Sequence, residues 1–487
     1  MNRAIAATPV VFLSFAGVLV LTSLALKAGL IPNDTLALWA GAIIAGDGQQ
    51  PIGRIVAAYP TIPFAAASFL ELLVPVGTPT PALLAAGLVG LLAGLWFVAF
   101  RKVGLSLLTA AVATTLLVVH PALLRAAIAG PSEMLLALFL YWFGNALFEL
   151  RERGAAPEVM VVSLSLLGLA FSHPMGAAIA AAAVPFLVFA VRPVLVANSA
   201  FNVVIALVFP TVFSLGAFTY MSWVFPGNGW SFYSAPSESL SAWTAGVTGI
   251  FDGSFTGIRA IDAALAIAIA LVLGAPLAAI AARRIRRRRP LLAPLAVLAA
   301  TTITAASITV ATGLFGDPAA LTIAAPVLCA IVIIRIPDIR ERVWPMLALL
   351  VVGLFGGALA LALVDPRAIT QLSASDVIPN RERLDSLKLG HATIGHDGVL
   401  IDTDNSPAVV IGRVDARGML TPASEEFNLA ILFARIDAPY FAVPNPQSAT
   451  GAQDRLVHTF PLLYRNGAPG YRLDYQNDTW RLYGQSR

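Results

Sequence analysis

The chain contains a series of long apolar runs, each close to the length of about 20 residues that an α-helix needs to cross a bilayer. Hydrophobic residues make up 58% of the sequence and charged residues 12%, whereas soluble domains usually carry about 25% charged residues. The mean hydropathy is +0.81. These runs predict a polytopic α-helical membrane protein.

Charged residues are concentrated in the last quarter of the chain. Residues 366–487 hold 25 of the 58 Lys, Arg, Asp and Glu side chains. We therefore expect a transmembrane module at 1–365, followed by a small C-terminal α/β soluble domain at 366–487. Within that domain the sequence pattern predicts a helix at 425–435. It also predicts strands at 398–403, 408–412, 440–443, 471–475 and 480–483.

About eleven transmembrane helices follow when each span takes about 20 apolar residues and the basic clusters lie in the cytoplasm. The stretch 61–77 is short and contains Pro63, Glu71 and Pro75, so we interpret it as an interfacial or re-entrant helix. This register places the N-terminus in the cytoplasm. The expected spans are 9–30, 81–100, 103–121, 134–150, 158–172, 175–191, 199–222, 259–282, 290–313, 318–336 and 344–364.

The same register leaves two long outer loops, 31–80 and 223–258, and brings the chain out of the last span at Asp365. The C-terminal domain is therefore expected outside the cytoplasm. The basic, Ala- and Leu-rich composition is typical of bacteria, which predicts a multi-pass protein of the inner (cell) membrane with a periplasmic domain.

The charge balance and the metal-ligating residue types exclude several functions. A net charge of +4 does not indicate nucleic-acid binding, and the basic run 283–289 is typical of a cytoplasmic anchor between two spans. The single cysteine, Cys329, excludes a disulfide framework. The five histidines lack metal-ligand spacing, so we expect no structural metal. A divalent cation beside Asp34 is left open.

Asp34 is the most informative candidate residue. It follows the first apolar run, where a carboxylate is costly unless it faces water, a partner or a substrate. The predicted register also brings Arg54, Arg125, Glu133 and His173 to the outer face. Span length and the placement of basic clusters set that register without reference to these residues, so their position on one side of the membrane is an independent indication of an outer site.

The order of these features resembles the GT-C superfamily of integral membrane glycosyltransferases, which use polyprenyl-phosphate-linked sugars. Protein O-mannosyltransferases and aminoarabinose transferases are members of this type. The likeness is strongest over residues 1–195. Its motifs are the Asp34 segment at 32–41, Gly53-Arg54 with Tyr59-Pro60, the segment with Pro121, Arg125 and Glu133, and the turn at 170–176.

The resemblance implies transfer of a sugar from a polyprenyl-phosphate donor, whose tail lies in the lipid bilayer, to a glycan, glycolipid or protein acceptor. Asp34 would be the base that takes the proton of the acceptor hydroxyl. Arg54 and Arg125 would bind the phosphate, because a guanidinium can donate two N–H hydrogen bonds to it. A single carboxylate is sufficient for a displacement that inverts the configuration at the anomeric carbon. A displacement that retains the configuration needs a second, nucleophilic carboxylate.

The remaining expected substrate-binding residues are Tyr59, Glu133, His173 and Trp230. The chain departs from the family in two places. Many members have two adjacent acids where this chain has Asn33-Asp34, and His173 stands where a basic residue is usual.

Each candidate residue also has a structural interpretation. Asp34 could cap a helix starting at Thr35, and Glu133 could interact with a helix dipole. Arg54 and Arg125 could anchor in the interface. His173 could be a turn residue. The aromatic residues of the 223–258 loop could form an interfacial belt.

Two other functions stay open at this stage. The protein could be a non-catalytic membrane scaffold, or a glycolipid transporter of envelope polysaccharide assembly. In the C-terminal domain the scattered acids favour a solvated surface over a metal site. These acids are Asp402, Asp404, Asp415 and Asp454.

Overall fold

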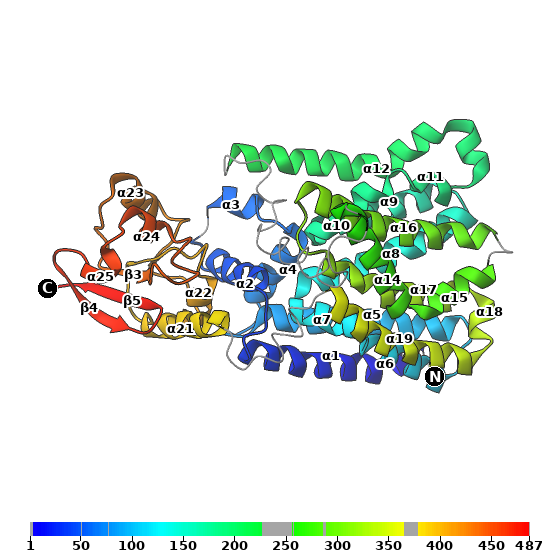
Figure 1. The fold of residues 1–487 in the computed structure, drawn as a ribbon, viewed down its shortest axis with the longest axis horizontal. Helices are drawn as coiled ribbons and strands as arrows, with labels where there is room; N and C mark the ends of the chain where they lie inside the picture. Colours follow the sequence, from blue (N-terminus) through cyan, green and yellow to red (C-terminus); the bar gives the residue numbers. More distant parts are fainter. Residues whose placement is uncertain are drawn as a thin grey trace. The chain divides into compact units, whose positions relative to one another are not determined.

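The computed structural model describes residues 3–49, 51–75, 77–225, 256, 258–285, 289–364 and 378–486 (Figure 1). The expected substrate-binding residue Trp230 and most of the 223–258 loop lie outside the described residues. The contacts divide the chain into two compact units. A helical unit contains Met1–Thr22, Tyr59–Ile62 and Ala85–Ser373, and a mixed unit contains Ser23–Ala58, Pro63–Leu84 and Ala374–Arg487.

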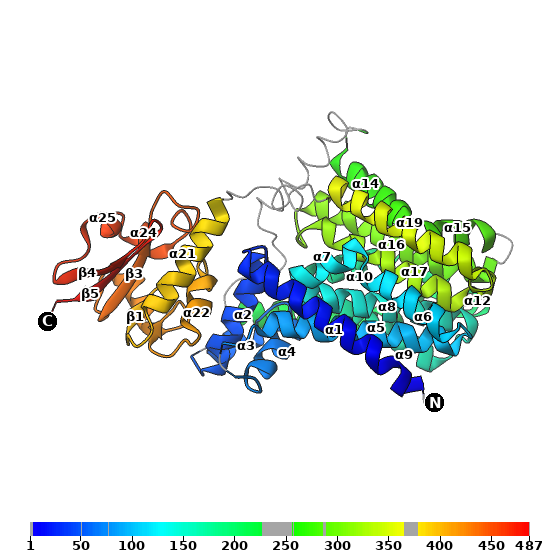
Figure 2. The ribbon, with the colours of Figure 1, turned by 90° about the horizontal axis from the view of Figure 1, so that it is seen from below.

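The helical unit is built from apolar helices that pack through small side chains. Helices α14, α16, α17 and α19 lie side by side (Figures 1 and 2). A Cβ atom on Gly356 of α19 would lie 2.0 Å from the Leu273 carbonyl oxygen of α14. Such glycines let the backbones of membrane helices approach closely. The helices of this unit, some of which extend into the other, are α1 (Arg3–Lys27), α5 (Thr80–Lys102), α6 (Leu107–Val118), α7 (Pro121–Ala129), α8 (Pro131–Glu152), α9 (Ala156–Ser172), α10 (Pro174–Ala183), α11 (Leu187–Ala190), α12 (Pro193–Val224), α14 (Arg259–Gly274), α15 (Pro276–Ile285), α16 (Arg289–Thr312), η2 (Pro318–Ile323), α17 (Ala324–Arg335), α18 (Pro337–Arg340) and α19 (Val343–Val364).

These helices confirm a multi-pass membrane protein, but they do not confirm a count of eleven spans. Within the described residues seven helices are long and apolar enough to cross a membrane, or up to nine if each bent pair is one span. The bends are 57° between α6 and α7 and 91° between α14 and α15. Pro121 and Pro276 begin the second helix of each pair, and a proline cannot donate the hydrogen bond that would continue the preceding helix.

The stretch expected to lie in the interface forms a short helix, α4 (Thr61–Glu71), and it is not among the candidate spans. Its 11 residues correspond to about 17 Å at 1.5 Å per residue, well short of the roughly 30 Å hydrocarbon core. Phe69, Leu72 and Leu73 in and just after it are exposed.

The mixed unit contains a five-stranded sheet in the order β2-β1-β3-β5-β4. The parallel strands are β1 (Val399–Leu400), β2 (Met419–Leu420) and β3 (Tyr440–Pro444), and the antiparallel pair is β4 (Tyr471–Gln476) and β5 (Trp480–Gln485). Successive strand residues face opposite sides, and each side has its own hydrophobic core. One core contains Val399, Ala442 and Leu482, and the other contains Leu400 and Phe441.

Helices cover both faces of this sheet (Figures 1 and 2). They are α21 (Ile378–Ala392) and α22 (Pro407–Arg413) on one face, with α23 (Glu425–Phe433), α24 (Arg455–Thr459) and α25 (Leu463–Asn466) on the other. The helix expected at 425–435 and the strands expected at 440–443, 471–475 and 480–483 are therefore present. The small C-terminal α/β region is confirmed.

The strand expected at 408–412 is wrong, because these residues form helix α22. A short apolar run does not distinguish a buried strand from a buried helix. Here Pro407 occupies the first turn, a position that favours helix initiation. The chain then pairs through the two-residue strand β2, which the sequence pattern did not indicate.

The first loop contributes the remaining helices of the mixed unit, α2 (Asn33–Gly46) and α3 (Ile52–Val56) together with α4. Leu36, Trp39 and Ile43 of α2 are buried in the same core as Val409 of α22 and Trp480 of β5. Their spacing of three and four residues places them on one helix face. Beyond α2, the Asp47 carboxylate accepts the Ala416 N–H at 2.8 Å. The C-terminal region therefore supplies the packing surface of α2.

Replacing Gly390 with Ala should destabilise the mixed unit. A Cβ atom on Gly390 of α21 would lie 2.2 Å from the Val409 carbonyl oxygen and 2.6 Å from the Arg413 nitrogen of α22. Separating the helices should cost about 1–3 kcal/mol, more than the roughly 1 kcal/mol that Ala gains over Gly in a helix. Thermal unfolding of the full chain in detergent measures this. The control is Gly87→Ala, where a Cβ meets no atom within 4 Å, and equal melting temperatures for the two variants would contradict the prediction.

Candidate functional site

Asp34 lies in the first turn of α2 and does not cap it. The helix begins at Asn33, and the residue at the cap position is Pro32, without a side-chain hydrogen bond. The capping interpretation of Asp34 is therefore wrong. The reason is local, since Pro32 already has the extended backbone that precedes a helix.

The Asp34 side chain is exposed, and within the described residues it takes part in no hydrogen bond or ion pair. The protein atoms around it partly desolvate the carboxyl and raise its pKa above the usual range of an aspartate. A carboxylate that is accessible, unpaired and more basic than usual is suited to accept a proton.

Arg383 holds the chain segment just before Asp34. Its guanidinium donates hydrogen bonds to the carbonyl oxygens of Gly29 and Ile31 and to Oδ1 of Asn33. Nothing in the local sequence pattern of α21 indicates a contact some 350 positions away, so Arg383 is not among the residues that the sequence predicts.

Arg54 of α3 belongs to a network of charges in the mixed unit. Its guanidinium lies 3.5 Å from Asp404 Oδ1 and donates to the Pro422 carbonyl at 2.9 Å. Arg455 joins the same Asp404 at 2.5 Å and reaches Asp402 at 2.9 Å. The Arg54 side chain is 38% exposed, so solvent reaches part of it.

The expectation that the acids of the C-terminal domain are solvated is wrong for two of them. Asp402 and Asp454 are fully buried. Asp402 is compensated by Arg455, which binds both of its oxygens. Asp454 caps α24 by accepting the Val457 N–H at 3.0 Å, and its Oδ2 has no hydrogen-bond partner.

Burial raises the pKa of Asp454 to about 7. Because this exceeds the value of about 3.9 in an unfolded chain, the folded state binds more protons than the unfolded state between these two pH values. The stability of wild type relative to Asp454→Asn should therefore fall as the pH rises from about 4 to about 7, then stay constant. Thermal unfolding of both chains at pH 5 and pH 8 measures this, and a constant difference would contradict it.

Arg125 of α7 is paired within the helical unit. Its guanidinium lies 2.7 and 2.9 Å from the two carboxylate oxygens of Glu133 and 3.5 Å from Asp317. Glu133 is buried in the first turn of α8, where a negative charge is favourable. Asp317 caps η2 through the Ala319 N–H. One cation is therefore shared between two carboxylates.

His173 and Tyr59 are both engaged with backbone in the helical unit. Nδ1 of His173 accepts the Met175 N–H at 3.0 Å at the start of α10, so this nitrogen carries no proton while the bond is made. The Tyr59 hydroxyl donates to the Ala170 carbonyl at 2.8 Å, and its ring lies 5.7 Å from that of Phe218. These contacts fix the turn between α9 and α10.

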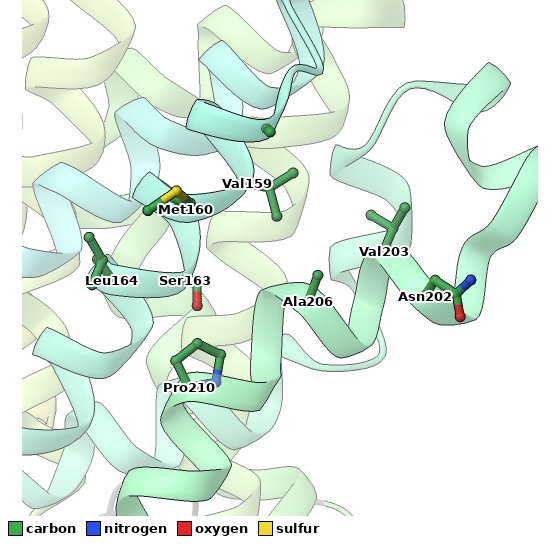
Figure 3. Close-up of a pocket in the computed structure, with 9 residues that line it drawn as sticks. Val159, Met160, Ser163, Leu164, Asn202, Val203, Ala206 and Pro210 are labelled. Atoms are coloured by element: carbon green, nitrogen blue, oxygen red, sulfur yellow. The ribbon is translucent and has the colours of Figure 1, made fainter.

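An apolar groove of about 470 Å³ lies between α9 and α12 (Figure 3). Its walls are almost entirely aliphatic, and Ser163 and Asn202 are the polar side chains that line it. Such a surface suits an alkyl or isoprenoid chain better than a polar ligand. Its lining residues are Ala156, Val159, Met160, Ser163, Leu164, Asn202, Val203, Ala206 and Pro210.

In the part of the chain that the structure describes, no group of three or more His, Cys, Asp or Glu side chains has the geometry to hold a metal ion. No protein-family model, curated protein or solved structure matches this chain.

Proposed function

We propose that this protein is an integral membrane glycosyltransferase of the GT-C type. It transfers a sugar from a polyprenyl-phosphate donor to a glycan, glycolipid or protein acceptor on the outer face of the membrane. The observation that carries the proposal is the state of the two candidate acids. Glu133 is neutralised by Arg125, whereas Asp34 is exposed and has no partner among the described residues.

In the proposed reaction Asp34 takes the proton of the acceptor hydroxyl as its oxygen bonds to the anomeric carbon. The bond between that carbon and the phosphate oxygen breaks, and polyprenyl phosphate leaves with the electron pair. The phosphate already carries negative charge, so it needs stabilisation by cations more than a proton. Arg54, which belongs to the same compact unit as Asp34, is the proposed cation, and the configuration at the anomeric carbon inverts.

Membrane topology is part of the proposal. The nine candidate spans of the described residues become eleven if α9 and the stretch 174–190, which contains α10 and α11, also cross the bilayer. The N-terminus then lies in the cytoplasm, and the C-terminal domain lies in the periplasm of a bacterial cell.

A non-catalytic scaffold is the second candidate, and one observation favours it. Arg54, the arginine proposed to bind phosphate, is already paired with the carboxylate of Asp404. Under the enzyme proposal, this ion pair must exchange for the donor phosphate when it binds.

A comparison of cell envelopes by mass spectrometry tests the proposed function. Strains of the native host would carry the intact gene or its deletion. The enzyme proposal expects the deletion to remove one sugar from a glycan, glycolipid or protein, with accumulation of the corresponding polyprenyl-phosphate sugar. An envelope that loses a whole polymer while its unit sugars and donors are unchanged would instead indicate a scaffold or transporter.

A further inference from the structure

The connector between α1 and α2 has carbonyl groups that the backbone does not satisfy. Helix α1 ends in a Schellman motif: the Gly29 N–H donates to the Leu26 carbonyl, the Leu30 N–H donates to the Ala25 carbonyl, and Gly29 has a φ of 71°. The carbonyl oxygens of Gly29 and Ile31 follow this motif and point to a side chain instead.

Arg383 supplies the donors for both carbonyls. Its Nη1 binds the Gly29 and Ile31 oxygens, the latter at 2.7 Å, and its Nη2 binds Asn33 Oδ1 at 2.8 Å. A guanidinium is planar and presents its N–H groups in a fixed fork. Three acceptors on one fork therefore fix the path of the chain from the end of α1 to the first residue of α2.

Helix α21, which carries Arg383, is itself held firmly in the mixed unit. The Trp480 indole donates to Ser386 at 2.9 Å, and the Asn477 side-chain amide donates to the Asp385 carbonyl at 2.9 Å. On the other side of Arg383, Glu382 accepts the Ala449 N–H at 3.2 Å. The sheet therefore determines the position of the helix that carries the Arg383 guanidinium.

We infer that Arg383 is a positioning residue through which the C-terminal domain fixes the direction of the Asp34 carboxylate. The inference depends on the proposed role of Asp34 as base. Arg383 acts through Asn33 and the two carbonyls, which precede Asp34 directly in the chain, and it has no contact with Asp34 itself. The C-terminal domain thereby becomes part of the catalytic apparatus.

The expected kinetic effect follows from geometry. Without the guanidinium the connector gains freedom, and Asp34 spends less time in the orientation that reaches the acceptor hydroxyl. A misplacement of about 1 Å can cost about 100-fold in rate. Arg383→Ala should therefore lower kcat by about this factor and leave the KM for the polyprenyl-phosphate donor nearly unchanged. Arg383→Lys should restore only part of the rate, because an ammonium lacks the planar fork.

The test uses the full chain with Arg383→Ala, Arg383→Lys and the control Arg381→Ala, an exposed residue two positions earlier on α21. Hydrogen exchange of purified protein, followed by mass spectrometry of residues 28–36, reports on the connector without any substrate. Transfer is measured in membranes with native envelope extract as the source of donor and acceptor. Exchange should be fastest in Arg383→Ala, intermediate in Arg383→Lys and unchanged in Arg381→Ala, with rates of transfer in the reverse order.

Two results would overturn the inference. One is wild-type exchange at 28–36 in Arg383→Ala, whatever the rate of transfer. The other is an exchange increase with a wild-type rate of transfer. If Arg383→Ala unfolds as a whole, Arg383→Lys alone decides by the same two criteria. Failure of the proposed function is distinguishable, because the wild-type chain would then show no transfer at all.

Discussion

Asp34→Asn is expected to reduce sugar transfer by about 10²- to 10⁴-fold while the chain folds normally. General-base catalysis contributes a factor of this size, and the amide cannot accept the proton of the acceptor hydroxyl. Because Asp34 is exposed and has no partner among the described residues, the substitution breaks no interaction of the fold. Donor and acceptor should still bind, so the loss should appear in kcat.

Two further variants separate chemistry from charge. Asp34→Glu keeps the carboxylate but displaces it by one methylene, and it should retain measurable transfer above that of Asp34→Asn. Glu341→Gln removes another exposed acid and should be neutral. The measurement is the rate of transfer in membranes at matched expression, with an unfolding curve for each variant. A fully active Asp34→Asn would end the proposal that this residue is the base.

Removing Arg125 should produce the second large effect, in this case on stability. Its guanidinium lies 2.7 Å from Glu133 and 3.5 Å from Asp317, and the Arg125 and Glu133 side chains are 17% and 10% exposed. Arg125→Ala leaves two acids without their shared cation. Removal of one partner of a buried ion pair costs about 3–5 kcal/mol, and the residual exposure places the expected loss at the lower end of that range.

The double variant Arg125→Ala/Glu133→Ala should recover part of this loss, because it also removes one of the two carboxylates that the guanidinium contacts. Arg435→Ala is the control. Arg435 lies 2.8 Å from Asp437, the two side chains are 75% and 69% exposed, and exposed pairs contribute about 0–1 kcal/mol. Thermal unfolding in detergent measures all three chains. A stable Arg125→Ala that has lost transfer would assign Arg125 to the substrate rather than to the fold.

The features that depended on local pattern could be predicted from the sequence. Apolar runs near 20 residues indicated the long helices, such as α5, α8 and α19, and the alternation of residues 480–483 indicated β5. Two expected spans are bent pairs of helices with breaks at Pro121 and Pro276. The length of an apolar run does not show whether the helix that it forms is straight or bent. Residues 408–412 were ambiguous, since a buried helix and a buried strand have the same composition over five positions.

The features that depended on long-range contacts could not be predicted. Asp402 is buried because Arg455, 53 residues later, neutralises it, and no spacing rule links the two. Arg383 binds a segment about 350 residues earlier. Conversely, the role proposed for Asp34 came from its position after the first apolar run, and it stays a prediction.

The shared hydrophobic core of α2 and the C-terminal region has a consequence for how the protein is made. Residues 31–44 leave the ribosome more than 300 residues before their packing partners at 389–482. During that interval the apolar face of α2 lacks the part of its native surface that the C-terminal region supplies. The first loop therefore reaches its native packing only after the last quarter of the chain has been synthesised. A ribosome that stops early leaves an exposed apolar helix that chaperones and proteases can recognise.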